Sequence, residues 1–123
     1  MKDPRVILPA AAYAAIGAAA LARPHLVPAL FGGSAPTAAA RTEVRAVYGG
    51  LPLALAAVLA SAGPAGTPHR GGTLRATAIA SGGMAAGRLF GAALDRRLSP
   101  WPTGAFLALE VALAASLAAA ARA

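Results

Sequence analysis

The sequence predicts an all-α protein, an up-down four-helix transmembrane bundle that forms one membrane domain over residues 1–123. The first observation is composition, because the chain is 58% hydrophobic and only 12% charged, whereas soluble domains carry about 25% charged residues. The second is size, because a chain of 123 residues has too little interior to hide so much apolar surface from water. The third is pattern: four apolar runs alternate with short segments rich in proline, glycine or arginine.

The first apolar run covers residues 6–22, follows Lys2 and Arg5, and is at the short end of what crosses a bilayer. We expect Pro9 in the first helical turn, where its missing N–H costs little. A secretory signal peptide is the alternative, since Ala20-Leu21-Ala22 fits a small-x-small cleavage site. Pro9 interrupts the apolar core of such a signal, so we favour a retained span.

A connector at 23–40, rich in proline, is expected to lie in the membrane interface. The second run, residues 43–62, begins after Thr42, a helix-capping residue, and contains two glycines and a proline that membrane helices tolerate. The third run, residues 73–94, has Gly83, Gly87 and Gly91 at four-residue spacing. Small residues at this spacing predict tight contact with a neighbouring helix, a second copy or a membrane partner. The fourth run, residues 102–121, begins beside Trp101, a typical interfacial residue.

The formal charge of +7 does not indicate nucleic-acid binding, because the arginines stand at the ends of the apolar runs and form no patch. Such positions are typical of anchors at a membrane surface. We therefore expect a multi-pass protein of the cell membrane, in contact with membrane lipid. Five basic residues on each side of the predicted bundle leave its orientation open. The chain has no cysteine, and His25 and His69 lack metal-ligand spacing, so no metal and no cofactor are expected.

A polar cluster is predicted in one half of the membrane. An up-down topology places the start of the second run, the end of the third and the start of the fourth on the same side. Arg88 then lies about 10 Å and Glu110 about 12 Å from that side, and we predict that they form an ion pair. Charged residues at such depth face a bundle interior and pair there. The remaining members of the predicted cluster are Glu43, Arg45, Tyr48 and Asp95.

Two interpretations of this cluster remain open. In the first, which we favour, the protein is a binding or accessory component and the cluster fixes the orientation of the helices. In the second, the protein is a membrane-embedded isomerase or cyclase. Glu43 and Glu110 would be its acid and base, and a lipophilic small molecule would be bound by the polar residues Arg45, Tyr48, Arg88 and Asp95. The sequence does not decide whether the protein is an enzyme.

The pattern Glu43-x-Arg45-Ala-x-Tyr48-Gly-Gly50, then Gly87-Arg88-Leu-Phe90 and a single Glu110, resembles a family of small bacterial four-helix membrane proteins. That family is a domain of unknown function and is distantly similar to DoxX-like membrane proteins. The resemblance covers nearly the whole chain and implies a four-helix integral membrane fold. It implies no established activity. Asp95 is followed here by Arg96-Arg97, where the pattern would have Asp-Gly, so the chain departs from the family at that boundary.

Overall fold

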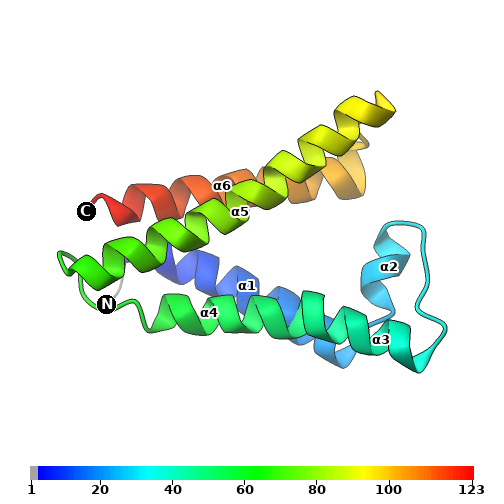
Figure 1. The fold of residues 1–123 in the computed structure, drawn as a ribbon, viewed down its shortest axis with the longest axis horizontal. Helices are drawn as coiled ribbons and strands as arrows, with labels where there is room; N and C mark the ends of the chain where they lie inside the picture. Colours follow the sequence, from blue (N-terminus) through cyan, green and yellow to red (C-terminus); the bar gives the residue numbers. More distant parts are fainter. Residues whose placement is uncertain (1–2) are drawn as a thin grey trace. The chain divides into compact units, whose positions relative to one another are not determined.

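The computed structural model describes residues 3–123, in which all regular secondary structure is helical (Figure 1). Lys2, expected as an anchor, lies outside the described residues. In chain order the helices are α1 (Pro4–Ala22), α2 (Leu26–Leu30), α3 (Ala38–Val44), η1 (Arg45–Gly50), α4 (Leu51–Ala60), α5 (Pro68–Asp95), η2 (Pro100–Gly104) and α6 (Ala105–Ala121). Since α3, η1 and α4 are continuous, and η2 leads into α6, the described residues form four long helices, one for each predicted run.

Three of these four helices are long and apolar enough to cross a membrane: Pro4–Ala22, Ala38–Ala60 and Pro100–Ala121. Helix α5 has 28 residues and is therefore long enough. It is not among the three, because glycines, threonines and Arg88 lower the hydropathy of its sequence. The chain is thus all-α with three candidate membrane spans.

The contacts divide the chain into two compact units. The N-terminal unit is Ile7–Ser61, and the C-terminal unit joins residues 3–6 to Ala62–Ala123. Helix α1 begins in the second of these units and continues in the first. Each unit is described below by itself.

In the N-terminal unit, α1 and η1 approach each other backbone to backbone. A Cβ added to Gly17 would lie 2.7 Å from the carbonyl oxygen of Gly49 and 2.7 Å from Cγ of Leu53. A Cβ added to Gly49 would lie 2.8 Å from Cδ2 of Leu21. A side chain at position 17 would collide with the backbone of η1, and one at position 49 would displace the side chain of Leu21, so small residues are favoured here as in other close helix crossings. Gly49 is one of the two glycines expected to be tolerated in the second run, whereas no pattern in the sequence marks Gly17.

The second long helix begins earlier than predicted and contains a widened turn. Thr37, not Thr42, is the N-cap, and its side chain accepts a hydrogen bond of 3.0 Å from the amide of Ala40. In η1 the helix is π-helical, and the amide of Leu51 donates to the carbonyl of Ala46, five residues earlier. Pro52 follows directly, and in a regular α-helix its ring would collide with a carbonyl four residues earlier. The extra residue in the turn accommodates that proline.

Pro9 lies in the sixth position of α1, because the helix begins at Pro4, two residues before the predicted start. The expectation that it occupies the first turn is therefore wrong. Inside a helix, proline leaves the carbonyl four residues earlier, here that of Arg5, without its backbone donor. The hydroxyl of Ser116 in α6 donates to this carbonyl at 2.8 Å and replaces the missing amide.

In the C-terminal unit, α5 and α6 form an antiparallel hairpin (Figure 1). Cβ atoms added to two glycines of α5 would lie within 4.0 Å of α6: Gly71 beside Ala121, and Gly82 beside Ala114. The buried residues on the two facing stripes follow alternating spacings of three and four. On α5 they include Leu74, Ala78, Ser81 and Ala85, and on α6 they are Glu110, Leu113, Leu117 and Ala120. This spacing is typical of helices that pack along their whole length.

The glycines at 83, 87 and 91 are not on the face of α5 that contacts α6. Apart from the adjoining residues and the nearby backbone of α5 itself, no described heavy atom lies within 4 Å of a Cβ added to any of the three. The expected tight contact through this stripe is therefore wrong for the α5–α6 pair. Contact with a second copy or a membrane partner through the stripe stays a prediction.

The fourth run becomes regular helix at Ala105, three residues after its predicted start. Trp101 has extended backbone angles, φ −131° and ψ 134°, and lies between two prolines that cannot donate to a helix. The amide of Gly104 closes the turn by donating to the carbonyl of Ser99 at 2.8 Å. Trp101 is 64% exposed, and its place at a membrane interface stays a prediction.

Candidate functional site: an arginine–glutamate pair between two helices

Arg88 and Glu110 form an ion pair across the α5–α6 hairpin. Nε of Arg88 donates to Oε2 of Glu110 at 2.8 Å, so the pairing predicted from the sequence is confirmed. Both residues lie on the stripes by which the helices face each other. The side chain of Glu110 is only 6% exposed, whereas that of Arg88 is 26% exposed. The carboxylate is therefore enclosed, and the guanidinium forms the accessible part of the pair.

Phe106 adds an aromatic ring to this pair. It precedes Glu110 by four residues, and this spacing puts both side chains on one face of α6. The guanidinium carbon of Arg88 lies 5.3 Å from the centre of the Phe106 ring, within the range of a cation–π interaction. The ring of Trp101 lies 6.0 Å from that of Phe106, centre to centre. Aromatic and charged groups thus connect the exposed Trp101 to the buried Glu110.

This arrangement provides a hydrogen-bond donor and an acceptor in apolar surroundings while carrying no net charge. An isolated charge would be expensive there, and pairing removes most of that cost. The phenyl ring of Phe106 beside the pair, and the indole of Trp101 next to that ring, offer contact area for an apolar molecule. Such combinations of apolar walls with a few polar groups are typical of small-molecule sites. Among residues 3–123, no three His, Asp or Glu side chains come together as possible metal ligands.

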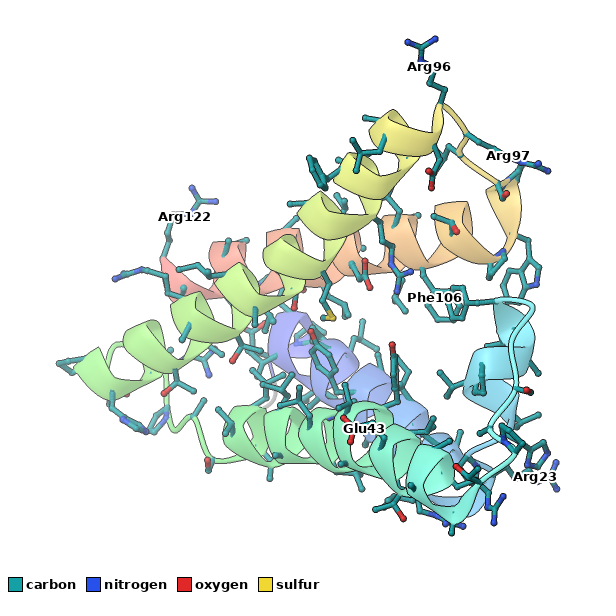
Figure 2. All side chains as sticks on the ribbon, turned by 45° about the vertical axis from the view of Figure 1, so that its right-hand side comes forward. Arg23, Glu43, Arg96, Arg97, Phe106 and Arg122 are labelled. Atoms are coloured by element: carbon teal, nitrogen blue, oxygen red, sulfur yellow. The ribbon has the colours of Figure 1, made fainter. Side chains whose placement is uncertain are left out.

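The structure does not group all predicted cluster residues with this pair. Arg45 donates from Nε to the carbonyl of Leu21 at 3.2 Å and thereby caps the end of α1. Tyr48 is 47% exposed in η1. Glu43, labelled in Figure 2, is exposed and has no ion pair with any described residue. These three residues belong to the N-terminal unit, so their place beside Arg88 and Glu110 stays a prediction.

Asp95 is the last residue of α5 and is exposed. It follows Arg88 by seven residues, which is about 10 Å along the helix axis. Asp95 forms no ion pair within the described part of the chain. Its predicted role in binding therefore gains no support from the ion pair of Arg88.

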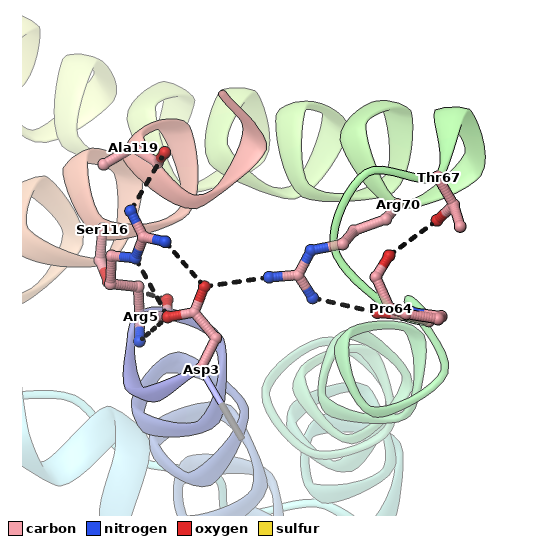
Figure 3. A network of polar contacts seen from close by, with 8 residues as sticks. Asp3, Arg5, Pro64, Thr67, Arg70, Ser116 and Ala119 are labelled. Carbon is pink, nitrogen blue, oxygen red and sulfur yellow. Dashed lines mark hydrogen bonds and ion pairs between the residues drawn. The ribbon is translucent and has the colours of Figure 1, made fainter. Parts of the chain in front are cut away.

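A second cluster, centred on Asp3, was missed by the sequence analysis (Figure 3). Oδ2 of Asp3 accepts hydrogen bonds of 3.0 Å from Nη2 of Arg5 and from Nη2 of Arg70. Arg70 is only 2% exposed and also donates from Nη1 to the carbonyl of Gly63 at 3.1 Å. The hydrogen bond from the Arg5 side chain holds the pKa of Asp3 below its usual range. A signal was present, because Asp3 is one of only four acidic residues in a strongly basic chain.

The fold and the site define a small helical protein with three candidate membrane spans and a partly buried ion pair between two helices. The chain belongs to the DUF4345 family, a domain of unknown function, which it matches over residues 5–121. This match confirms the resemblance to a family without assigned activity. The distant likeness to DoxX-like proteins stays a prediction. No curated protein and no solved structure matches the chain.

Proposed function

We propose that the protein is a four-span, multi-pass protein of the cell membrane that binds the polar end of a lipophilic molecule at Arg88 and Glu110. It would act as a binding or accessory component and not as a catalyst. The observation that carries this proposal is the 2.8 Å ion pair itself, in which a buried carboxylate holds a partly exposed guanidinium. A polar group on an apolar ligand can exchange hydrogen bonds with such a pair without adding charge to the site.

The assignment of α5 as the additional span is supported by its packing. Helix α6 is a candidate span, and α5 lies beside it from Gly71 to Arg88. Two polar side chains of α5 also have hydrogen-bond partners within the helix. The hydroxyls of Thr77 and Ser81 each donate at 3.0 Å to the carbonyl four residues earlier. Because these groups need no water, their cost in a bilayer is small.

Cysteine labelling tests the four-span topology, since the natural chain contains no cysteine. Single cysteines at Ser34 and Ser99 should react with a membrane-impermeant thiol reagent from one side of the membrane. A cysteine at Thr67 should react only from the other side. Labelling of the Ser34 and Thr67 variants from the same side would contradict four spans.

Ligand binding is tested by identifying lipophilic molecules that copurify with the protein. Organic extracts of the wild type and of the Arg88→Gln/Glu110→Gln double variant are compared by mass spectrometry. A Glu43→Gln variant, which changes an exposed carboxylate outside the pair, is the matched control. We expect at least one lipophile to be enriched with the wild type and the control and lost from the double variant. Identical extracts from all three proteins would refute binding at this pair.

The structure favours this role over the alternative of an isomerase or cyclase. In that alternative, Glu110 and Glu43 exchange protons with the substrate. The carboxylate of Glu110 already accepts a hydrogen bond from Nε of Arg88, so a substrate would have to displace or share this bond to exchange a proton with it. If the Glu110→Gln variant still bound the ligand but no longer converted it to a product, the protein would be an enzyme.

A further inference from the structure

The turn between α5 and α6 presents two arginine side chains, those of Arg96 and Arg97, which are exposed. The backbone amide of Arg96 donates to the carbonyl of Ala93 at 3.4 Å, and that of Arg97 to the carbonyl of Ala92 at 3.0 Å. These bonds close the end of α5. Neither arginine side chain makes a hydrogen bond or an ion pair with any residue in 3–123. Figure 2 shows both side chains pointing away from the hairpin.

The backbone conformation at position 96 favours glycine, but the residue there is arginine. Arg96 has φ 50° and ψ 38°, the left-handed conformation that often ends a helix. Glycine adopts this conformation without strain, whereas a residue with a Cβ does so at a cost. An arginine at this position is therefore not explained by the needs of the helix end. It places a positive charge at the tip of the hairpin.

Apolar side chains flank the two arginines. Leu98 is 48% exposed, and Trp101 is 64% exposed. The candidate span that contains α6 begins at Pro100, directly between these two residues. The turn thus combines cationic groups with a leucine and a tryptophan at the point where the chain enters the membrane. Tryptophan is enriched at the level of the lipid headgroups, and an arginine there reaches the phosphates.

We propose that this turn, residues 96–101, binds the headgroups of anionic phospholipids at the bilayer surface. The inference rests on the membrane span assigned to α6 under the proposed function. Arginine binds phosphate through parallel hydrogen bonds, and two adjacent arginines can contact the same or neighbouring headgroups. Asp95 offsets one of the two charges, which leaves a net positive turn. The attraction is specific for anionic lipid, because a zwitterionic headgroup brings its own cation to the site.

The chain contains one tryptophan, so Trp101 reports on the lipids around this turn without labelling. The protein is reconstituted into phosphatidylcholine vesicles that contain either brominated phosphatidylglycerol or brominated phosphatidylcholine as a quencher of its fluorescence. We expect phosphatidylglycerol to quench Trp101 more strongly at equal mole fraction. Each arginine near an anionic surface should favour phosphatidylglycerol by up to about fivefold. Salt should reduce this preference.

The test variant is Arg96→Gln/Arg97→Gln, and the matched control is Arg75→Gln/Arg122→Gln. The control removes the same charge from exposed arginines, and Arg122 lies at the opposite end of the hairpin (Figure 2). We expect the test variant to lose the preference for phosphatidylglycerol and the control to keep it. An equal loss in both would show a general charge effect and would overturn the proposal.

Two further outcomes separate this inference from its premise. If inorganic phosphate restores Trp101 fluorescence in the presence of brominated phosphatidylglycerol, the turn binds free phosphate and the lipid proposal is overturned. Equal quenching by the two brominated lipids would refute the anionic preference while leaving α6 in the membrane. If neither brominated lipid quenches Trp101, the membrane assignment of this end of α6 fails as well.

Discussion

Removing Arg88 from the Arg88–Glu110 pair should destabilise the protein more than removing Glu110. Loss of one partner from a fully buried ion pair costs about 3–5 kcal/mol. Here the Glu110 side chain is 6% exposed, and that of Arg88 is 26% exposed. Arg88→Gln leaves the enclosed carboxylate without its cation, and we expect a loss of about 3 kcal/mol, at the lower end of that range. Glu110→Gln leaves a guanidinium that is partly exposed and that Phe106 still faces, so about 2 kcal/mol is expected.

The double variant should lose less than the sum of the two single variants, because no charge is then left alone. We expect a coupling of about 2 kcal/mol, within the range measured for residues in contact. The measurement is a double-mutant cycle on reversible unfolding in detergent micelles. Glu43→Gln is the control, and its change should stay within about 0.5 kcal/mol. Additive losses in the cycle would show that the pair contributes nothing as a pair, and the proposed site would lose its basis.

Three further predictions follow from contacts elsewhere in the two units. Asp3→Asn should lower the melting temperature at neutral pH, and its difference from the wild type should close as pH falls below about 4, the ordinary Asp value. The pKa of Asp3 is lowered in the folded protein. The ionised side chain therefore stabilises the fold above its unfolded pKa, and this stabilisation is lost as pH falls through its folded pKa. A pH-independent difference in melting temperature would contradict this. Gly17→Leu should destabilise the protein by at least about 1–3 kcal/mol, because a Cβ already clashes there. Gly87→Leu should be as stable as the wild type when the protein is a monomer in detergent. Equal losses of stability in the two variants would contradict the conclusion that Gly17 is in a tight helix contact and Gly87 is not. Ser116→Ala should cost about 1 kcal/mol in chemical denaturation by leaving the Arg5 carbonyl without a donor, whereas unchanged stability would show that water replaces the hydroxyl.

The ion pair could be predicted from the sequence because its geometry depends on few quantities. The rise per residue of a helix is fixed, and antiparallel neighbours bring matching depths together. The sequence therefore predicts the Arg88–Glu110 pair, and the structure confirms it. The helical class followed in the same way from the length and composition of the four runs.

Other features depend on contacts that spacing does not specify. The four-residue spacing of the glycines in α5 predicts a flat face but does not say what the face meets, and α6 packs against a different one. Gly17 lacked any repeated pattern, although its helix crosses η1 at that point. Asp3 lies before the first apolar run, and the depth of charges within membrane spans says nothing about a residue outside them. The π-helical turn at η1 depends on how the helix accommodates Pro52. The sequence shows that a proline is present in the run but not how the backbone adapts to it.

The contacts of residues 3–5 have a consequence for biosynthesis. Residues 3–5 are synthesised before their partners, which include Arg70 in α5 and, in α6, Ser116 and Ala119 (Figure 3). The C-terminal unit therefore cannot close before α6 has been synthesised. Until then, the hydroxyl of Ser116, which replaces the amide missing at Pro9, is not available to the Arg5 carbonyl in α1. A chain interrupted before α6 leaves that carbonyl without its donor.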